Sequence, residues 1–187
     1  GIVTDSLEKF AYKLVIANNT DAEITGFKVI DVFPHLDDTA LVLNQEGVRM
    51  PRESQFQNTF DWETGVTVPA GYTVYYLNEP VGAITGNLED FEATLNWQTV
   101  GNAQTSAIKV VANDGVVVGA NSSVEIIVPM IAPENTDLQL SGKKAYNTFA
   151  RTDNELGGYV EPNRVYNEML MPKGKITLTK VARDAFA

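Results

Sequence analysis

The sequence predicts an all-β protein built as an antiparallel β-sandwich, and three observations indicate this. Apolar side chains recur at every second position in many short segments, as in strands with one buried face. Clusters of Asn, Asp, Gly, Ser and Pro separate these segments and favour turns. No stretch long enough for a regular helix has apolar residues along one helical face. Short strands at regular spacing are typical of two facing antiparallel sheets.

The predicted strands cover most of the chain and are rich in Val, Ile, Thr and Tyr. Residues 5–14 are expected to lead into the first strand rather than to form a helix, because β-rich residues follow them. Residues 91–97 alternate most clearly, with Phe91, Leu95 and Trp97 on the predicted core side. In chain order the strands are 12–18, 27–32, 39–43, 71–77, 91–97, 106–113, 123–130, 144–152 and 175–181.

Residues 44–70 interrupt this pattern and are predicted to form one long irregular excursion over a face of the sandwich. One short edge strand is expected around Ser54 to Phe60. Trp62 lies between two acidic residues in this segment, so we expect it to be exposed and to be a candidate ligand contact. Residues 1–172 are predicted to form the sandwich module, and residues 173–187 a C-terminal linker strand that leads to a following domain.

Composition excludes several classes of partner. The 187 residues are enough for one substantial core, and the formal net charge is -10. Lys and Arg form no cluster, which argues against nucleic acid and anionic membranes as partners. No apolar run is long enough to be inserted in a membrane. The chain starts at Gly1 without a signal peptide, so we expect it to be part of a longer protein, with targeting sequences elsewhere.

The sequence carries no recognisable catalytic motif. It has no cysteine and a single histidine, His35, which excludes thiolate and histidine-rich metal sites. We therefore predict no cofactor and no enzymatic activity, although a carboxylate pair for glycoside hydrolysis stays open among the many acidic residues. Asp37 and Asp38 are candidate calcium ligands, with solvated turn acids as the alternative.

Asp31 has an unusual position for a carboxylate. It shares its side of the predicted strand with Phe27 and Val29, which mark that side as the core. A buried carboxylate is unfavourable unless it is paired or protonated. Asp31 therefore either lies at the strand end in water or has a partner elsewhere in the chain.

Four segments in order resemble landmarks of immunoglobulin-like modules in Gram-positive cell-wall-anchored surface proteins. They are "YKLVIANNTDAEITGFKVIDVFP", "RESQFQNTFDWETGVTVPAGYTVYY", "KKAYNTFART" and "GKITLTKV", the last being similar to the linker that opens a B-type repeat. The resemblance implies an immunoglobulin-like β-sandwich in an extracellular stalk or adhesin, anchored to the cell wall through sequence outside this chain. Its partners would be neighbouring domains of the same polypeptide.

The resemblance also implies an intramolecular isopeptide bond between a lysine and an asparagine, assisted by a buried acid. Asp31 matches the acid of the family and Asn147 its closing asparagine. The family lysine has no counterpart in this sequence, so Lys13 is the best substitute and Lys9 the next. Lys13 shares the parity of Val15 and Ala17, so we expect it on the same side of the strand as these apolar residues. The alternative is that Asp31 and Asn147 are hydrogen-bonding partners or strand-end groups, with no covalent link between them.

Three functional hypotheses follow. A structural stalk module should be inert toward small molecules and resist unfolding. A binding module would use residues 44–70 to hold a glycan or a host protein. An enzyme would gather perturbed acids in a pocket. The sequence favours the first hypothesis.

Overall fold

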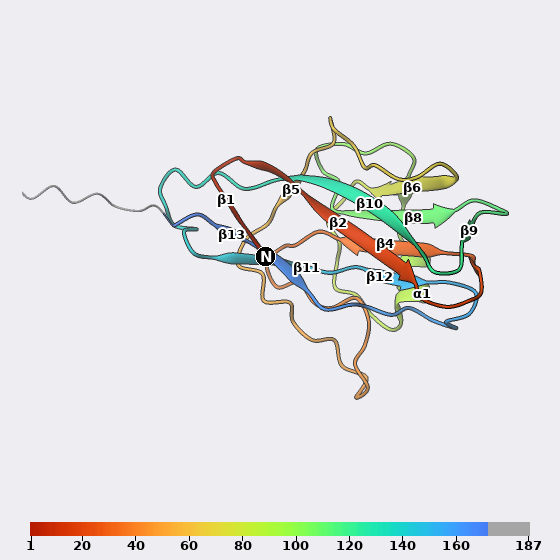
Figure 1. Cartoon of the computed structure of the whole chain (residues 1–187). Coiled ribbons are helices and arrows are strands. Elements are labelled where there is room, and N and C mark those ends of the chain that lie inside the picture. Colours follow the sequence, from red (N-terminus) through yellow and green to blue (C-terminus); the bar gives the residue numbers. More distant parts are fainter. Residues whose placement is uncertain (172–187) are drawn as a thin grey trace, which may run out of the picture.

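The computed structural model describes residues 1–171 and confirms an all-β fold with one short helix (Figure 1). The linker strand predicted at 173–187 lies outside the described residues. The single helix is α1 (Leu88–Ala93), and no helix of the described part could cross a lipid bilayer. The strands are β1 (Ile2–Thr4), β2 (Lys9–Asn18), β3 (Ile24–Thr25), β4 (Lys28–Val32), β5 (Thr59–Phe60), β6 (Tyr72–Leu77), β7 (Trp97–Gln98), β8 (Ala107–Ala112), β9 (Val117–Val118), β10 (Ser122–Ile131), β11 (Lys144–Asn147), β12 (Ala150–Thr152) and β13 (Val165–Met169).

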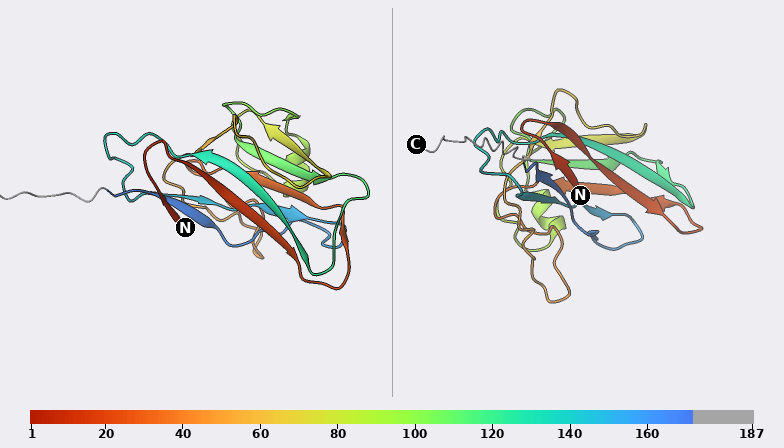
Figure 2. Two further views of the ribbon diagram at one scale, coloured as in Figure 1. Left: turned by 45° about the horizontal axis from the view of Figure 1, so that its top comes forward. Right: turned by 60° about the vertical axis from the view of Figure 1, so that its left-hand side comes forward.

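Two sheets form the body of the molecule. The larger has the strand order β12-β4-β8-β6-β7, and the smaller has the order β2-β10-β5. All pairs in both are antiparallel, and β2 and β10 pair along ten residues each, from Lys9 opposite Ile131 to Asn18 opposite Ser122. Figure 2 shows β2 and β10 as a long twisted ribbon lying over the larger sheet.

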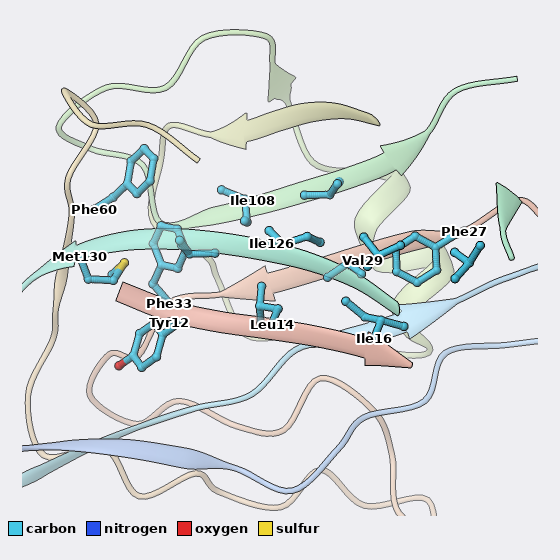
Figure 3. Close-up of a cluster of buried hydrophobic side chains, with 14 residues drawn as sticks. Tyr12, Leu14, Ile16, Phe27, Val29, Phe33, Phe60, Ile108, Ile126 and Met130 are labelled. Carbon is cyan, nitrogen blue, oxygen red and sulfur yellow. The ribbon is translucent and has the colours of Figure 1, made fainter. Parts of the chain in front are cut away.

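The main core lies between these two sheets. Alternate residues of β2 and β10, among them Leu14 and Ile126, point at β4 and β8, where Val29 and Ile108 meet them (Figure 3). Burial alternates along β2 because successive side chains of a strand point to opposite faces. Each fully buried aliphatic side chain of this kind contributes roughly 1.5–3 kcal/mol of transfer free energy.

Strand β4 is buried on both faces. Its odd-numbered side chain Val29 belongs to the main core, whereas Ile30 and Val32 pack on the other side with Leu77 and the helix residue Leu88. A central strand covered on both sides has a nearly continuous apolar sequence, as "VIDV" does apart from Asp31. The structure therefore places Asp31 inside the protein and not at a solvated strand end.

A third sheet has the order β1-β13-β11. β13 pairs with β11 in antiparallel fashion and with β1 in parallel fashion. A small cluster of Phe56, Ala132, Ala145 and Met169 lies beneath it. This sheet brings the first and the last strand of the described residues together.

Two predicted strands are wrong. Residues 91–97 contain the end of α1 and only the short β7, because Asn87 caps a helix: its side chain accepts a hydrogen bond from the Asp90 N–H at 2.8 Å. Phe91 of α1 and Leu95, which follows the helix, still pack against the buried cluster that contains Ile30, Leu77 and Leu88. Residues 39–43 form no strand, although Leu41 is fully buried and Thr39 makes an isolated bridge to Pro51.

The excursion at 44–70 is more regular than predicted. From Pro51 to Phe60 exposed and buried residues alternate, as in an extended strand. Only Thr59 and Phe60 form a strand, β5, which pairs with β10 within the expected edge-strand region.

Candidate functional site

Asp31 and Asn147 meet inside the protein. Asn147 Nδ2 donates a hydrogen bond to Asp31 Oδ2 at 3.1 Å, which joins β4 to β11. Both side chains are almost completely buried. The remaining oxygens, Asp31 Oδ1 and Asn147 Oδ1, have no hydrogen-bond partner among the described residues. When Asp31 is ionised, one oxygen of each of the two side chains thus lacks a hydrogen-bond donor.

Burial raises the pKa of Asp31 to about 7. The hydrogen bond from Asn147 and the positive charge of Arg52 act against this rise, and the negative charge of Glu161 adds to it. Burial also raises the pKa of Glu161, although the backbone N–H of Val42 donates to its Oε2 at 2.8 Å and opposes the shift. Burial therefore raises the pKa values of both carboxylic acids, although the charge of Arg52 opposes the shift in each case.

Arg52 forms an ion pair with a third carboxylate, that of Asp38. Its Nε lies 3.0 Å from Asp38 Oδ2, and both side chains are buried. The Nε proton is not aligned with an acceptor, so charge rather than a hydrogen bond holds this pair. Arg52 Nη1 donates to the backbone oxygen of Val32, and Ser54 Oγ donates to Asp38 at 2.9 Å. Ser54 also accepts from the backbone N–H of Tyr146, which ties the excursion to β11.

A second buried network surrounds Asn167 of β13. Its Oδ1 accepts hydrogen bonds from Tyr12 at 3.1 Å and from Asn58 at 2.8 Å. Its Nδ2 donates to the Thr4 hydroxyl at 3.2 Å. Burial, with the charge of Asp31, raises the pKa of the Tyr12 hydroxyl above its ordinary value, so this hydroxyl stays protonated. Four segments of the chain, β1, β2, the excursion and β13, are joined here.

The expected position of Lys13 is wrong. In β2 the even-numbered residues face the core, so Lys13 and Val15 lie on the outer face. Lys13 Nζ forms an exposed ion pair with Glu125 at 2.6 Å, and Lys9 Nζ lies 2.9 Å from Asp61. Both lysines are thus engaged away from Asp31 and Asn147. The structure brings the expected acid and asparagine together and does not bring either candidate lysine to them.

The other candidate residues lie apart from this cluster. Trp62 follows β5 and its side chain is 49% exposed. Asp37 is exposed at a turn with a positive φ of 60°, whereas Asp38 is buried against Arg52, which is a poor arrangement for a shared calcium ion. In residues 1–171 no group of three or more His, Asp or Glu side chains is placed to hold a metal ion. His35 Nδ1 lies 2.8 Å from the Leu36 oxygen.

Several clefts adjoin the excursion. One, of about 580 Å³, lies between residues 40–53 and residues 161–164, with Arg52, Glu161 and Arg164 in its lining. Another, of about 500 Å³, has uncharged polar side chains such as Gln57, Asn58 and Thr105 beside Phe33 and Val81.

Sequence reasoning missed Arg52, Ser54, Asn58 and Asn167. For the first three residues the sequence did contain a pattern that could have found them, namely the even-numbered positions of an extended segment. The even-numbered residues of this segment are all buried: Arg52, Ser54, Phe56, Asn58 and Phe60. Alternation of polar residues does not stand out, since a buried arginine or asparagine looks like a surface residue in a sequence. Nothing in the sequence distinguishes Asn167 from an exposed asparagine.

No family model matches the sequence, and no curated protein sequence matches it. Two solved structures are similar over most of the chain. One is a family 123 glycoside hydrolase from Clostridium perfringens, with 10% identity, a TM-score of 0.37, and coverage of 90% of this chain and 22% of that one. The other is AvmM, which catalyses macrocyclization in alchivemycin A biosynthesis, with 10% identity, a TM-score of 0.37, and coverage of 95% of this chain and 88% of that one. At these values neither bears on the function.

Proposed function

We propose that this chain is a structural module of a bacterial cell-surface stalk or adhesin, with an immunoglobulin-like sandwich as its body. It would hold neighbouring domains of the same polypeptide in place outside the cell, without catalysis. Its excess of acidic residues suits a solvated segment that does not aggregate.

The observation that carries this proposal is the use of the buried polar side chains. Asp31 and Asn147 join segments that are 116 residues apart, and Asn167 and Thr4 join segments that are 163 apart. Ser54 links the excursion to Tyr146, 92 residues away. A polar group buried in this way specifies one arrangement of the chain and is strongly unfavourable when its partner is lost. These contacts serve the fold, as expected for a module that must stay folded.

Limited proteolysis, urea unfolding and ligand screening test this function together. The chain at about pH 6 should resist cleavage within residues 44–70, unfold cooperatively, and give no specific response on arrays of glycans and extracellular proteins. Asn167→Ala should speed cleavage, because it leaves Tyr12, Asn58 and Thr4 without their common partner. Asn163→Ala, at an exposed position, is the matched control. Rapid cleavage of the native chain, or turnover of a substrate, would contradict the proposal.

The cleft of about 580 Å³ favours one second candidate, a ligand-binding module. It combines apolar side chains such as Val42 and Met50 with the half-exposed guanidinium of Arg164. A specific array response that Met50→Ala abolishes would support this alternative. A response that depends instead on Trp62 would place binding at the far end of the excursion.

A further inference from the structure

The first and last strands of the described residues form a parallel ladder. Ile2 is opposite Asn167, Val3 opposite Glu168 and Thr4 opposite Met169. The backbone N–H of Leu170 extends the ladder by a hydrogen bond of 2.8 Å to the Thr4 oxygen. Figure 1 shows β1 beside β13, where the chain approaches its C-terminal end.

The direction of this ladder decides how it would carry tension. A pull on Gly1 draws β1 backward, from Thr4 toward Ile2. A pull on the chain beyond Met171 draws β13 forward, from Val165 toward Met169. Because the strands are parallel, these pulls slide them past each other along their length, and the bridging hydrogen bonds are loaded together. In an antiparallel pair the same pulls would open the bonds one after another.

We propose that β1 and β13 form a mechanical clamp, which resists tension applied through the two ends of the chain. This inference rests on the proposed function, since only a stalk module with neighbouring domains is pulled in this direction. The clamp gives the structural module a specific mechanical property: the module stays folded under tension until β1 slides off β13.

Buried side chains fasten the short ladder. Thr4 is 1% exposed, and its hydroxyl accepts from Asn167 Nδ2 at 3.2 Å. Asn167 is fully buried and is held in turn by Tyr12 and Asn58. Sliding β1 by one residue would turn Thr4 outward and break this contact, because strand side chains alternate between faces. Because Thr4 and Asn167 are both buried, water reaches the hydrogen bond between their side chains poorly and cannot readily replace it as β1 moves.

The force then has a path into the body of the molecule. β13 pairs with β11 along four residues, from Lys144 opposite Glu168 to Asn147 opposite Val165. At the end of β11, Asn147 is bonded to Asp31 of β4, which is a central strand of the larger sheet. The clamp is therefore connected to the sheet with the most strands and is not an isolated ribbon.

Single-molecule pulling in two directions tests the clamp. The chain has no cysteine, so an introduced cysteine is a unique handle. Pulling between cysteines added before Gly1 and after Ala187 loads the ladder in shear. If the handle before Gly1 is replaced by Asp5→Cys, both forces act at the end of the ladder where Thr4 lies opposite Met169. The hydrogen bonds of the ladder then open one after another. Three paired residues share the shear, so the first rupture force should be on the order of two- to threefold higher in the first direction. Equal forces would overturn the inference.

A disulfide across the ladder supplies a second measurement. Val3 and Glu168 are opposite each other on the outer face, and neighbouring parallel strands bring Cα atoms within disulfide range. With Val3→Cys and Glu168→Cys oxidised and the ends held by peptide tags, pulling should release almost none of the length between these residues. Reduction should restore the native rupture. Full extension of the oxidised protein would show that the two strands are not paired as described.

The clamp and the proposed function can fail separately. If the force is low in both directions while the chain still resists protease and urea, the clamp is wrong and the structural role stands. If the chain is also cleaved rapidly without force, both are wrong.

Discussion

Asp31 and Asn147 face each other across the junction of β4 and β11, with one hydrogen bond of 3.1 Å made and one oxygen on each side chain unpaired. A proton on Asp31 Oδ1 would supply the donor that Asn147 Oδ1 lacks. The acid and the amide then complement each other in the manner of two matched carboxamides. Below about pH 7 the folded protein therefore holds Asp31 in its neutral form.

Stability should fall as the pH rises through neutrality. The pKa of Asp31 is raised from 3.8 to about 7, so the folded state keeps a proton that the unfolded state has released. From about pH 5 to pH 8 the free energy of unfolding should fall by about 3 kcal/mol through Asp31, and further through Glu161, whose pKa is also raised. Urea unfolding at several pH values measures this slope. Asp31→Asn should flatten it and stabilise the protein at about pH 8. A slope that is the same in both proteins would show that Asp31 is not its source.

Asn147→Asp should make the free energy of unfolding fall more steeply as the pH rises. It puts a second carboxyl group about 3 Å from Asp31 in a buried site, where both cannot ionise together. A smaller loss is expected at about pH 5, where only the unfolded state has released the added proton, and a loss of about 3 kcal/mol or more relative to the native protein at about pH 8. Asn163→Asp adds the same charge at an exposed position and should leave the curve nearly unchanged. Parallel curves for the two variants would argue against direct coupling.

Arg52→Met should be strongly destabilising, by about 3–5 kcal/mol, because it leaves the buried Asp38 without a counter-charge. Asp38→Asn in the Arg52→Met background should recover much of this loss. Arg164→Met makes the same chemical change at a half-exposed arginine that pairs with the exposed Glu53, and should cost about 1 kcal/mol or less. Denaturant unfolding of the four proteins measures these differences. Equal costs at Arg52 and Arg164 would mean that the Asp38 pair is not buried in solution.

Lys13→Ala should change the free energy of unfolding by no more than about 0.5 kcal/mol, because its ion pair with Glu125 is exposed on both sides. Tyr12→Phe, at the adjacent residue, should cost about 1 kcal/mol through its lost hydrogen bonds. The intact mass should show no loss of ammonia, about 17 Da, between Lys13 and Asn147. A mass deficit that Lys13→Ala removes would restore the isopeptide hypothesis.

The pattern of apolar residues was sufficient to find the long strands of the two main sheets. β2, β4, β8 and β10 lie within or overlap the predicted strands, because a two-residue period leaves few other structures. The period alone does not say which parity faces inward. In β2 the odd-numbered Val15 and Ala17 compete with Leu14 and Ile16, and only pairing with β10 decides between them. Because the even-numbered residues of β2 face inward, Lys13 lies on the surface.

The polar cluster was only half predictable. Asp31 stood out because an acid interrupts an apolar strand, and Asn147 because it shares a parity with Ala145. Arg52, Asp38 and Glu161 join them through tertiary contacts of segments without regular strands. The helix at Leu88–Ala93 was missed for a different reason: its signal is the cap at Asn87 with the acidic residues that follow, and not its short apolar stripe.

The pairing of β1 with β13 also sets the order in which the protein can fold. Within residues 1–171 β1 has no strand neighbour except β13, so β1 can be paired only after the polypeptide has been synthesised as far as β13. The Thr4 to Asn167 and Asp31 to Asn147 contacts impose the same delay. Contacts between segments so far apart in the chain slow folding, because the intervening loop must close first. The native state can therefore form only once the stretch from β1 to β13 is available as a whole, and a chain cut before Val165 would leave β1 without its partner.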